Sequence, residues 1–98
     1  MDQTAPIPTV PISIPPALRS RVGGHTKVMA AGRTIRELID ALEQQFPGLR
    51  FNLCYETGQL RPYVNIFLNS ENIRYLQGLD TPLSPGATLA ILPSVAGG

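Results

Sequence analysis

The sequence predicts an α+β fold: a mixed sheet with one main helix packed across one of its faces. Two observations lead to this prediction. One segment repeats its apolar side chains at helical spacing, and several short segments alternate apolar and polar side chains as half-buried strands do. The chain of 98 residues is long enough for one modest core, and a helix laid on a sheet buries the apolar surface of both.

The first two strands are predicted at residues 10–14 and 25–30. Residues 10–14 alternate apolar and polar side chains, while Pro11 restricts this strand to limited pairing or to a place where its missing N–H is not needed. Gly23 and Gly24 then reverse the chain. The two strands are therefore expected to form a hairpin.

Residues 34–46 have the clearest helical pattern in the chain. The apolar side chains at helical spacing are Ile35, Leu38, Ile39, Leu42 and Phe46. Thr34 and Glu37 have the spacing of a capping box, in which a hydroxyl and a carboxylate accept hydrogen bonds from N–H groups at the start of a helix. Pro47 and Gly48 predict the end of the helix, because the residue before a proline avoids helical geometry and glycine accepts a left-handed turn.

The segments that follow the helix are less regular. Residues 49–62 have no sustained period, so we expect a long connection there, with a short strand or turn near residues 53–56. Ile73 and Tyr75 predict a short strand, and residues 78–86 predict a loop because they are rich in proline and glycine.

Two stronger strands are predicted at residues 63–69 and 87–93. Their alternation places Leu89 toward the core and places Phe67 and Leu92 on the opposite face. A slip of one residue in this phase would exchange the two faces.

The predicted order is strand, strand, helix, strand, short strand, strand, which is the order of a β-grasp fold. We expect three parts in the chain. A proline-rich flexible arm occupies residues 1–9, a β-grasp domain occupies residues 10–93, and a flexible C-terminal Gly-Gly tail occupies residues 94–98.

Charge and composition exclude several classes of function. The net charge is +1 and the eight Lys and Arg residues are scattered along the chain, whereas nucleic-acid binders cluster theirs. No apolar run approaches the roughly 20 residues that span a bilayer. Cys54 is the only cysteine, so no internal disulfide and no cysteine zinc site is expected, and Cys54 itself is expected to be a structural thiol. We therefore expect a cytoplasmic protein that binds no nucleic acid, membrane or metal.

The final residues of the sequence, 93–98, are small or conformationally special and end in Gly97 and Gly98. Glycine has no Cβ, so a Gly-Gly terminus passes through a narrow channel and presents its carboxylate to a buried active site. An enzyme that adenylates the terminus of a protein needs such a substrate. At about 7% glycine usage, such a pair arises by chance roughly once in 200 chains, so it is significant only together with the predicted fold.

These features resemble the ThiS and MoaD type of sulfur carrier, which are ubiquitin-like β-grasp proteins that end in Gly-Gly. The segments that carry the resemblance are the Gly23-Gly24 turn and residues 63–69, 71–75 and 91–98. Within the family the resemblance is strongest to the carriers of cysteine biosynthesis. The tail also resembles that of molybdopterin-synthase small subunits.

The resemblance implies a protein substrate that binds no cofactor and is not itself an enzyme. An E1-like activating enzyme of the ThiF or MoeB type would use ATP to adenylate Gly98, and a sulfur donor would convert the adenylate to a thiocarboxylate. The acceptor would be a cysteine-synthase-type enzyme or, alternatively, the large subunit of molybdopterin synthase. Another alternative is a ubiquitin-like modifier, whose Gly98 would be joined to lysines of target proteins. The residues expected to contact the partner enzyme are Phe67, Leu92, Val95 and Ala96.

Overall fold

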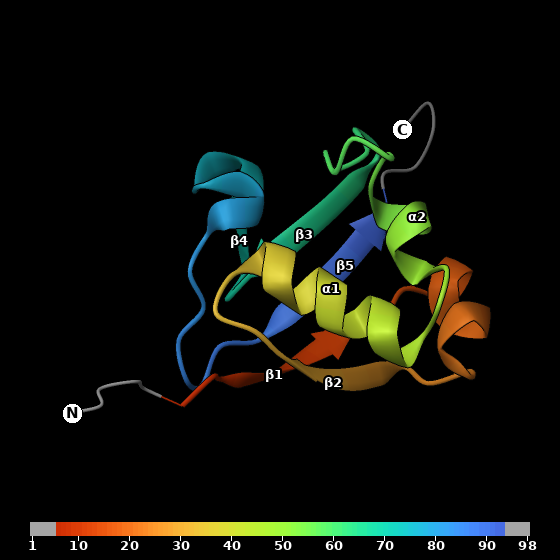
Figure 1. Ribbon diagram of the computed structural model, residues 1–98, viewed down its shortest axis with the longest axis horizontal. Coiled ribbons are helices and arrows are strands. Elements are labelled where there is room, and N and C mark those ends of the chain that lie inside the picture. The colour runs from red at the N-terminus through yellow and green to blue at the C-terminus, as the bar shows by residue number, and fades with distance from the viewer. Residues whose placement is uncertain (1–5, 94–98) are drawn as a thin grey trace.

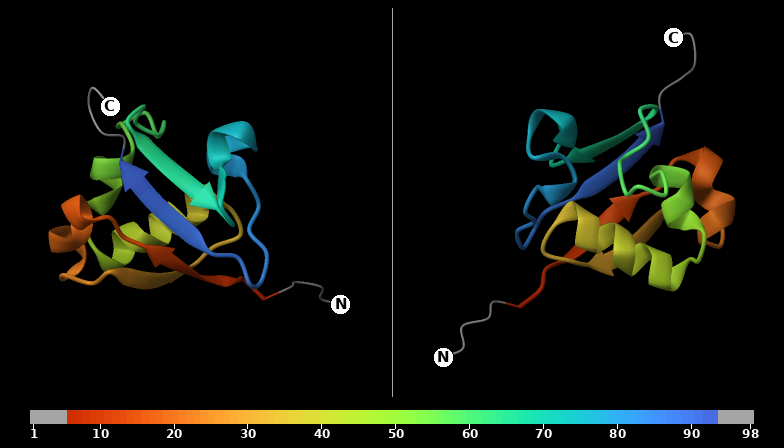
Figure 2. Two further views of the ribbon diagram at one scale, coloured as in Figure 1. Left: turned by 180° about the vertical axis from the view of Figure 1, so that it is seen from behind. Right: turned by 45° about the horizontal axis from the view of Figure 1, so that its top comes forward.

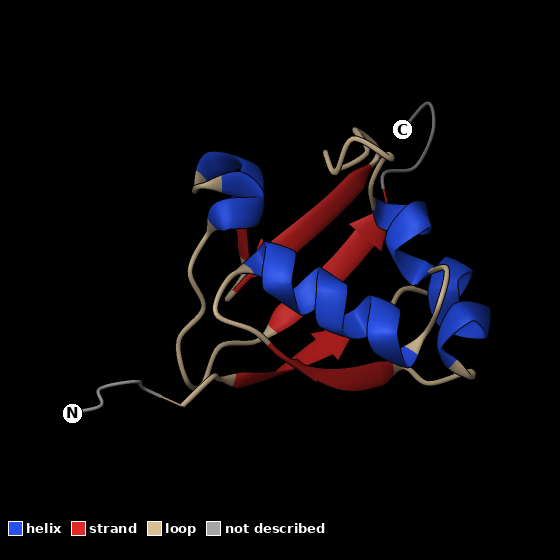
Figure 3. Ribbon diagram, in the orientation of Figure 1, coloured by secondary structure: helices blue, strands red, loops and turns tan. Residues whose placement is uncertain are grey.

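The computed structural model describes residues 6–93, which form a five-stranded mixed sheet with a helix packed across one face (Figures 1 and 3). The strands are β1 (Thr9–Ser13), β2 (Lys27–Ala31), β3 (Val64–Leu68), β4 (Glu71–Asn72) and β5 (Leu89–Pro93). The helices are α1 (Ile35–Gln45) and α2 (Leu49–Leu53), with short 3-10 segments η1 (Pro16–Val22), η2 (Ile73–Tyr75) and η3 (Gly78–Asp80).

The sheet has the strand order β2-β1-β5-β3-β4. Strand β5 is the last in sequence, yet it lies in the middle, parallel to β1 and antiparallel to β3. The ends of β1 and β5 and the start of β3 therefore lie at one end of the sheet. This arrangement confirms the predicted α+β, ubiquitin-like β-grasp fold, a mixed sheet with one main helix across it.

Strand β1 accommodates Pro11 because its N–H is not needed at that position. The Ile14 amide donates to the Thr26 carbonyl, and the Gly32 amide donates to the Pro8 carbonyl. Along an antiparallel pair of strands, residue pairs that exchange hydrogen bonds alternate with pairs that exchange none. Pro11 lies opposite Met29, in a pair that exchanges none. The pairing of β1 with β5 begins one residue later, at Ile12. The expectation about Pro11 is confirmed.

Strand β1 begins at Thr9, one residue before the predicted start of the domain. Thr9 pairs with Ala31, and the carbonyl of Pro8 accepts the hydrogen bond from Gly32. The sheet thus includes backbone from the end of the proline-rich segment.

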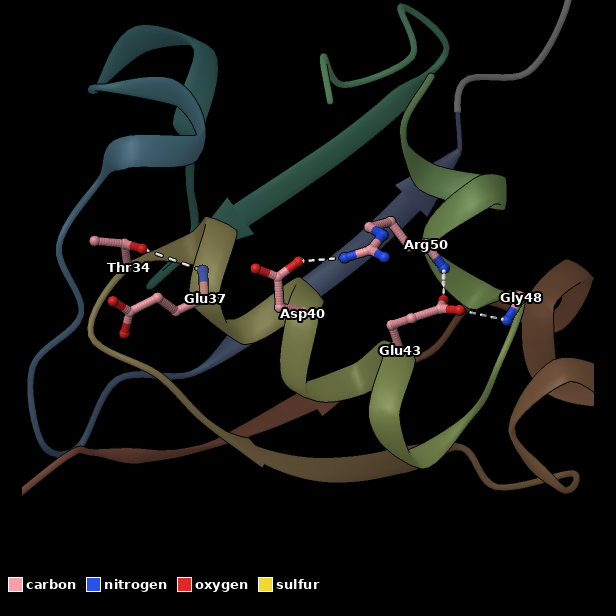
Figure 4. Close-up of polar contacts among 6 residues, drawn as sticks. All are labelled: Thr34, Glu37, Asp40, Glu43, Gly48 and Arg50. Atoms are coloured by element: carbon pink, nitrogen blue, oxygen red, sulfur yellow. Dashed lines mark hydrogen bonds and ion pairs between the residues drawn. The ribbon is translucent and has the colours of Figure 1, made fainter. Parts of the chain in front are cut away.

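Helix α1 begins as the capping-box spacing predicts. The Thr34 hydroxyl accepts a hydrogen bond from the Glu37 amide at 3.2 Å (Figure 4). The Glu37 carboxylate accepts one from the Arg33 amide at 2.8 Å. Four of the five predicted apolar residues are buried and Phe46 is half-buried. Helix α1 ends at Gln45, and Gly48 adopts a left-handed conformation, with φ 98°, in the turn that leads into α2.

The predictions for the irregular segments were wrong in part. The connection at residues 49–62 begins with the unpredicted helix α2, whereas the short strand or turn expected near residues 53–56 is confirmed by the isolated bridge between Cys54 and Leu60 and by the turn at residues 56–57. Ile73 and Tyr75 lie in the 3-10 segment η2, while the short strand β4 precedes them at Glu71–Asn72. The pairing of β4 with β3 stops at Asn72, whose side chain accepts a hydrogen bond from the Arg74 amide and starts η2.

Candidate functional site at the exit of the tail

The four predicted site residues of the tail, Val95, Ala96, Gly97 and Gly98, lie outside the described residues. The described chain ends at Pro93, which pairs with Val64 at the start of β3. We call the end of the sheet around Pro93 the tail exit. It is bordered by η1 on the side of β1 and by residues 61–63 on the side of β3 (Figure 2).

Phe67 and Leu92 lie on the face of the sheet opposite α1, as the alternation predicts. Leu92 is 48% exposed and Phe67 is half-buried, while Leu89 on the other face is only 3% exposed. A shallow groove of about 390 Å³ on this outer face is lined by Pro11, Phe67 and Leu92, among others. The strand phases are therefore correct, and an apolar surface lies beside the tail exit.

Arg74 fastens the backbone that pairs with the end of β5. Its Nη2 atom donates to three carbonyl oxygens, at 2.9 Å to Arg61, 3.2 Å to Pro62 and 2.6 Å to Val64. Hydrogen bonds from a charged donor are stronger than neutral ones. Val64 is the first residue of β3 and pairs with Pro93 at the end of β5. Arg74 therefore restrains the backbone next to the end of β5.

Arg61 is held beside the same backbone by two aromatic rings. Its guanidinium carbon lies 4.7 Å from the ring centroids of both Phe51 and Tyr55, and its Nε donates to the Phe51 carbonyl at 2.8 Å. Phe51 is 61% exposed and Tyr55 is 42% exposed. Exposed aromatic rings around an ordered arginine are typical of protein interaction surfaces.

Helix α2 is fixed to α1 by polar contacts (Figure 4). The Glu43 carboxylate accepts hydrogen bonds from the amides of Gly48 and Arg50 at 3.0 and 2.9 Å, and the side chain of Arg50 forms an ion pair with Asp40. These amide hydrogen bonds hold the pKa of the Glu43 carboxyl below its ordinary value, and the Arg50 charge adds to this. The contacts position Phe51 of α2, which stacks on Arg61.

Cys54 is buried, as the sequence predicts for a structural thiol, and burial raises the pKa of the thiol. Among residues 6–93, no group of three or more His, Cys, Asp or Glu side chains is placed to hold a metal ion. No helix in this span has the length and apolar character needed to cross a membrane.

The sequence allows Arg61 and Arg74 to flank this surface but favours solvated charges, whereas in the structure both side chains donate to backbone carbonyls. The acceptors of Arg74 lie 10 to 13 residues before it, so no local pattern reveals them. Of the two rings that contact Arg61, Phe51 belongs to α2 and Tyr55 lies two residues after its end, and the sequence did not predict α2.

Known proteins are similar to this chain in sequence and in fold. The sulfur carrier protein CysO of Mycobacterium tuberculosis is 40% identical over 91 residues, which cover 91% of this chain and 98% of CysO. A chain in the crystal structure of the Amycolatopsis orientalis BexX/CysO complex superposes with a TM-score of 0.85 at 40% identity, covering 91% of this chain and 99% of that chain. Small archaeal modifier protein 3 of Haloferax volcanii is 34% identical over 65 residues, or 66% of this chain and 70% of that protein.

The fold and the open tail exit define a ubiquitin-like β-grasp protein. The model of the ThiS family matches residues 12–98, from within β1 to the last residue of the tail. The chain therefore belongs to the ThiS family, and it is a sulfur carrier of the ThiS and CysO type.

Proposed function

We propose that this carrier delivers sulfur for cysteine biosynthesis as a thiocarboxylate on Gly98. The observation that carries the proposal is the 40% identity to CysO, which covers 98% of that protein. The geometry supports it, because the tail leaves the sheet beside an exposed apolar face and two ordered arginines.

The chemistry follows from the electrophilicity of the terminus. A carboxylate resists attack by a nucleophile, so an E1-like enzyme first joins the Gly98 carboxylate to AMP and releases pyrophosphate from ATP. Hydrosulfide released by the donor then attacks the acyl carbon and loses its proton, and AMP leaves with the electrons of the carbon–oxygen bond. The thiocarboxylate that remains is a nucleophile at neutral pH. On the acceptor enzyme, of the cysteine-synthase type, this sulfur forms a bond to the β-carbon of an activated serine, and the activating group of the serine leaves with the electrons of its carbon–oxygen bond.

The experiment that tests the proposal compares the native chain with a chain extended by one alanine after Gly98. We expect ATP, a cognate E1-like enzyme and a sulfur donor to raise the intact mass of the native chain by one oxygen-to-sulfur exchange. The extended chain should stay unmodified, because its glycine no longer carries the terminal carboxylate. Its thermal melting should match the native chain, since the change lies beyond β5. Equal modification of both chains would contradict the proposal.

A second experiment tests the pathway. The thiocarboxylate form, mixed with an activated serine and a cysteine-synthase-type enzyme, should gain a cysteinyl group on Gly98. Transfer to a molybdopterin precursor, without transfer to serine, would instead assign the carrier to molybdopterin synthesis.

A ubiquitin-like modifier is the second candidate function, and the 34% identity to small archaeal modifier protein 3 favours it. Both functions use an adenylated Gly98 and differ in the next acceptor. Lysine-linked conjugates that form without any detectable thiocarboxylate would support the modifier.

A further inference from the structure

Four of the eight basic residues, although scattered along the sequence, lie around the tail exit in the fold. Between Asp2 and Glu37 the sequence contains no acidic residue. Arg19 and Arg21 belong to η1, which directly follows β1 at this end of the sheet, and Lys27 pairs with Ser13 at the end of β1. Figure 2 shows η1 and the end of β5 at the same end of the molecule in both views.

The other side of β5 contributes Arg61. It precedes β3, whose first residue, Val64, pairs with Pro93. The strand order β1-β5-β3 thus places cationic side chains on both sides of the exit. We call Arg19, Arg21, Lys27 and Arg61 the basic rim.

Within residues 6–93, the basic rim takes part in no ion pair. The two ion pairs found there join Arg36 to Asp80 and Arg50 to Asp40. Arg21 and Lys27 are exposed. Arg19 donates through Nε to the Ile14 carbonyl, and Arg61 donates through Nε to the Phe51 carbonyl, so a hydrogen bond to a carbonyl positions each side chain.

The acidic residues of the described span are mostly distant from the rim or already bonded. Glu71 of β4 pairs with Leu68 at the opposite end of β3, and Glu37 lies at the start of α1. Glu43 accepts two backbone hydrogen bonds. Glu56 is the exception, because it is exposed and follows Tyr55, whose ring contacts Arg61. The four cations of the rim still outnumber this one carboxylate around the end of β5.

The length of the tail determines what this rim faces. Five residues follow Pro93, and a fully extended chain spans at most about 3.5 Å per residue, so the Gly98 carboxylate can lie at most roughly 18 Å from the end of β5. An enzyme that encloses Gly98 in its active site must therefore bring its entrance against the tail exit. A surface with unpaired cations is complementary to an acidic one.

We propose that the basic rim docks on an acidic surface at the active-site entrance of the enzyme that adenylates Gly98. This inference rests on the proposed function. It assigns to η1 a role beside that of the apolar face of Phe67 and Leu92, and Lys27, which lines the same groove as these two residues, connects the two surfaces. The rim accelerates encounter and orients the tail, and the apolar face supplies contact area.

The test compares two charge reversals, Arg21→Glu at the rim and Arg33→Glu at the start of α1, away from it. Both residues are exposed, and the two substitutions change the net charge equally. With the native E1-like enzyme at about 50 mM salt, Arg21→Glu should raise the KM for the carrier about tenfold with kcat unchanged, and Arg33→Glu less than about twofold. Near 0.5 M salt the effect of Arg21→Glu should largely vanish, because salt screens exposed charges.

Several outcomes would overturn the inference. The inference is contradicted if Arg21→Glu has the same KM as the native chain. It is also contradicted if KM rises equally in Arg21→Glu and Arg33→Glu, or if the rise in KM for Arg21→Glu persists at about 0.5 M salt. Tight binding of the native chain to duplex DNA at about 150 mM salt, lost in Arg21→Glu without any change in KM, would assign the rim to nucleic acid. If no thiocarboxylate forms on the native chain, the proposed function and this inference are both overturned. If the native chain is converted to the thiocarboxylate and Arg21→Glu leaves KM unchanged, only the inference is overturned. Thermal melting confirms that both variants are folded.

Discussion

Arg74 connects η2 to the backbone before β3 through three carbonyl oxygens of one short stretch. Other contacts also hold that stretch. Val64 donates to the Arg61 carbonyl, Arg61 donates to the Leu53 carbonyl through its backbone, and the Arg61 side chain packs on two rings. The Arg74 guanidinium adds to these restraints on the backbone that pairs with the end of β5.

Replacing Arg74 with methionine should destabilise the protein by about 1–2 kcal/mol, because three carbonyls lose a charged donor while the apolar length of the side chain is kept. Urea denaturation would show this as a lower midpoint, and hydrogen exchange at the Val64 amide should become faster. Arg33→Met is the matched control, since its side chain is exposed, and it should stay within about 0.5 kcal/mol. An Arg74→Met midpoint equal to that of the control would show that the three bonds contribute nothing net.

Glu43 makes the position of α2 dependent on pH. Its folded pKa lies below the unfolded value of about 4.3, so its stabilising effect is fully present above that pH and is lost as pH falls through the folded pKa. Glu43→Gln should therefore lower the urea midpoint at pH 7, and the difference from the native chain should shrink by pH 3. For the control Glu71→Gln, on an exposed residue of β4, we expect little difference at pH 7. A Glu43→Gln difference that widened toward pH 3 would contradict this account.

At the scale of elements, periodicity predicted α1 and the long strands because each has one face buried and the other exposed. Helix α2 escaped prediction because it has only five residues, too few to show a period, although Leu49 and Leu53 are both buried one turn apart. Its stability comes from Glu43 on α1, which accepts from the amides at its start. Such a contact between elements has no signature within the segment itself.

The candidate site was predictable in part for the same reason. The outward faces of β3 and β5 follow from alternation, so Phe67 and Leu92 were placed correctly. The basic rim was not predictable, because Arg19 and Arg61 come together only through the strand order around β5.

The two faces of β5 should respond differently to a buried charge. Leu89→Asp places a carboxylate in the core without a partner and should unfold the protein. Leu92→Asp should stay within about 0.5 kcal/mol of the native stability, because its side chain is 48% exposed, and should weaken binding to the activating enzyme. Phe67→Ala should weaken the same binding more than it weakens the fold. Circular dichroism and calorimetric titration with the enzyme measure both quantities, and unfolding of all three variants would contradict the assignment.

At the scale of the whole molecule, the N-terminal arm is expected to contribute little to folding. A chain that begins at Pro6 should melt as the native chain does, because β1 and the Pro8 carbonyl are retained. A chain that begins at Val10 should still fold but melt a few degrees lower, since it loses the Pro8–Gly32 hydrogen bond, worth about 0.5–1 kcal/mol. Failure of the shorter chain to fold would show that the arm is part of the core structure.

The place of β5 in the middle of the sheet also sets the order of events during synthesis. Strands β1 and β3 pair with β5 and not with each other, so the sheet cannot close until the last strand has been made. Chains whose partners are far apart in sequence fold late and slowly. A nascent chain interrupted before Leu89 keeps two unpaired strand edges, which favours aggregation and degradation over the native state. Because the residues of the tail come directly after β5, a chain that presents them to an enzyme already contains every strand that it needs to fold.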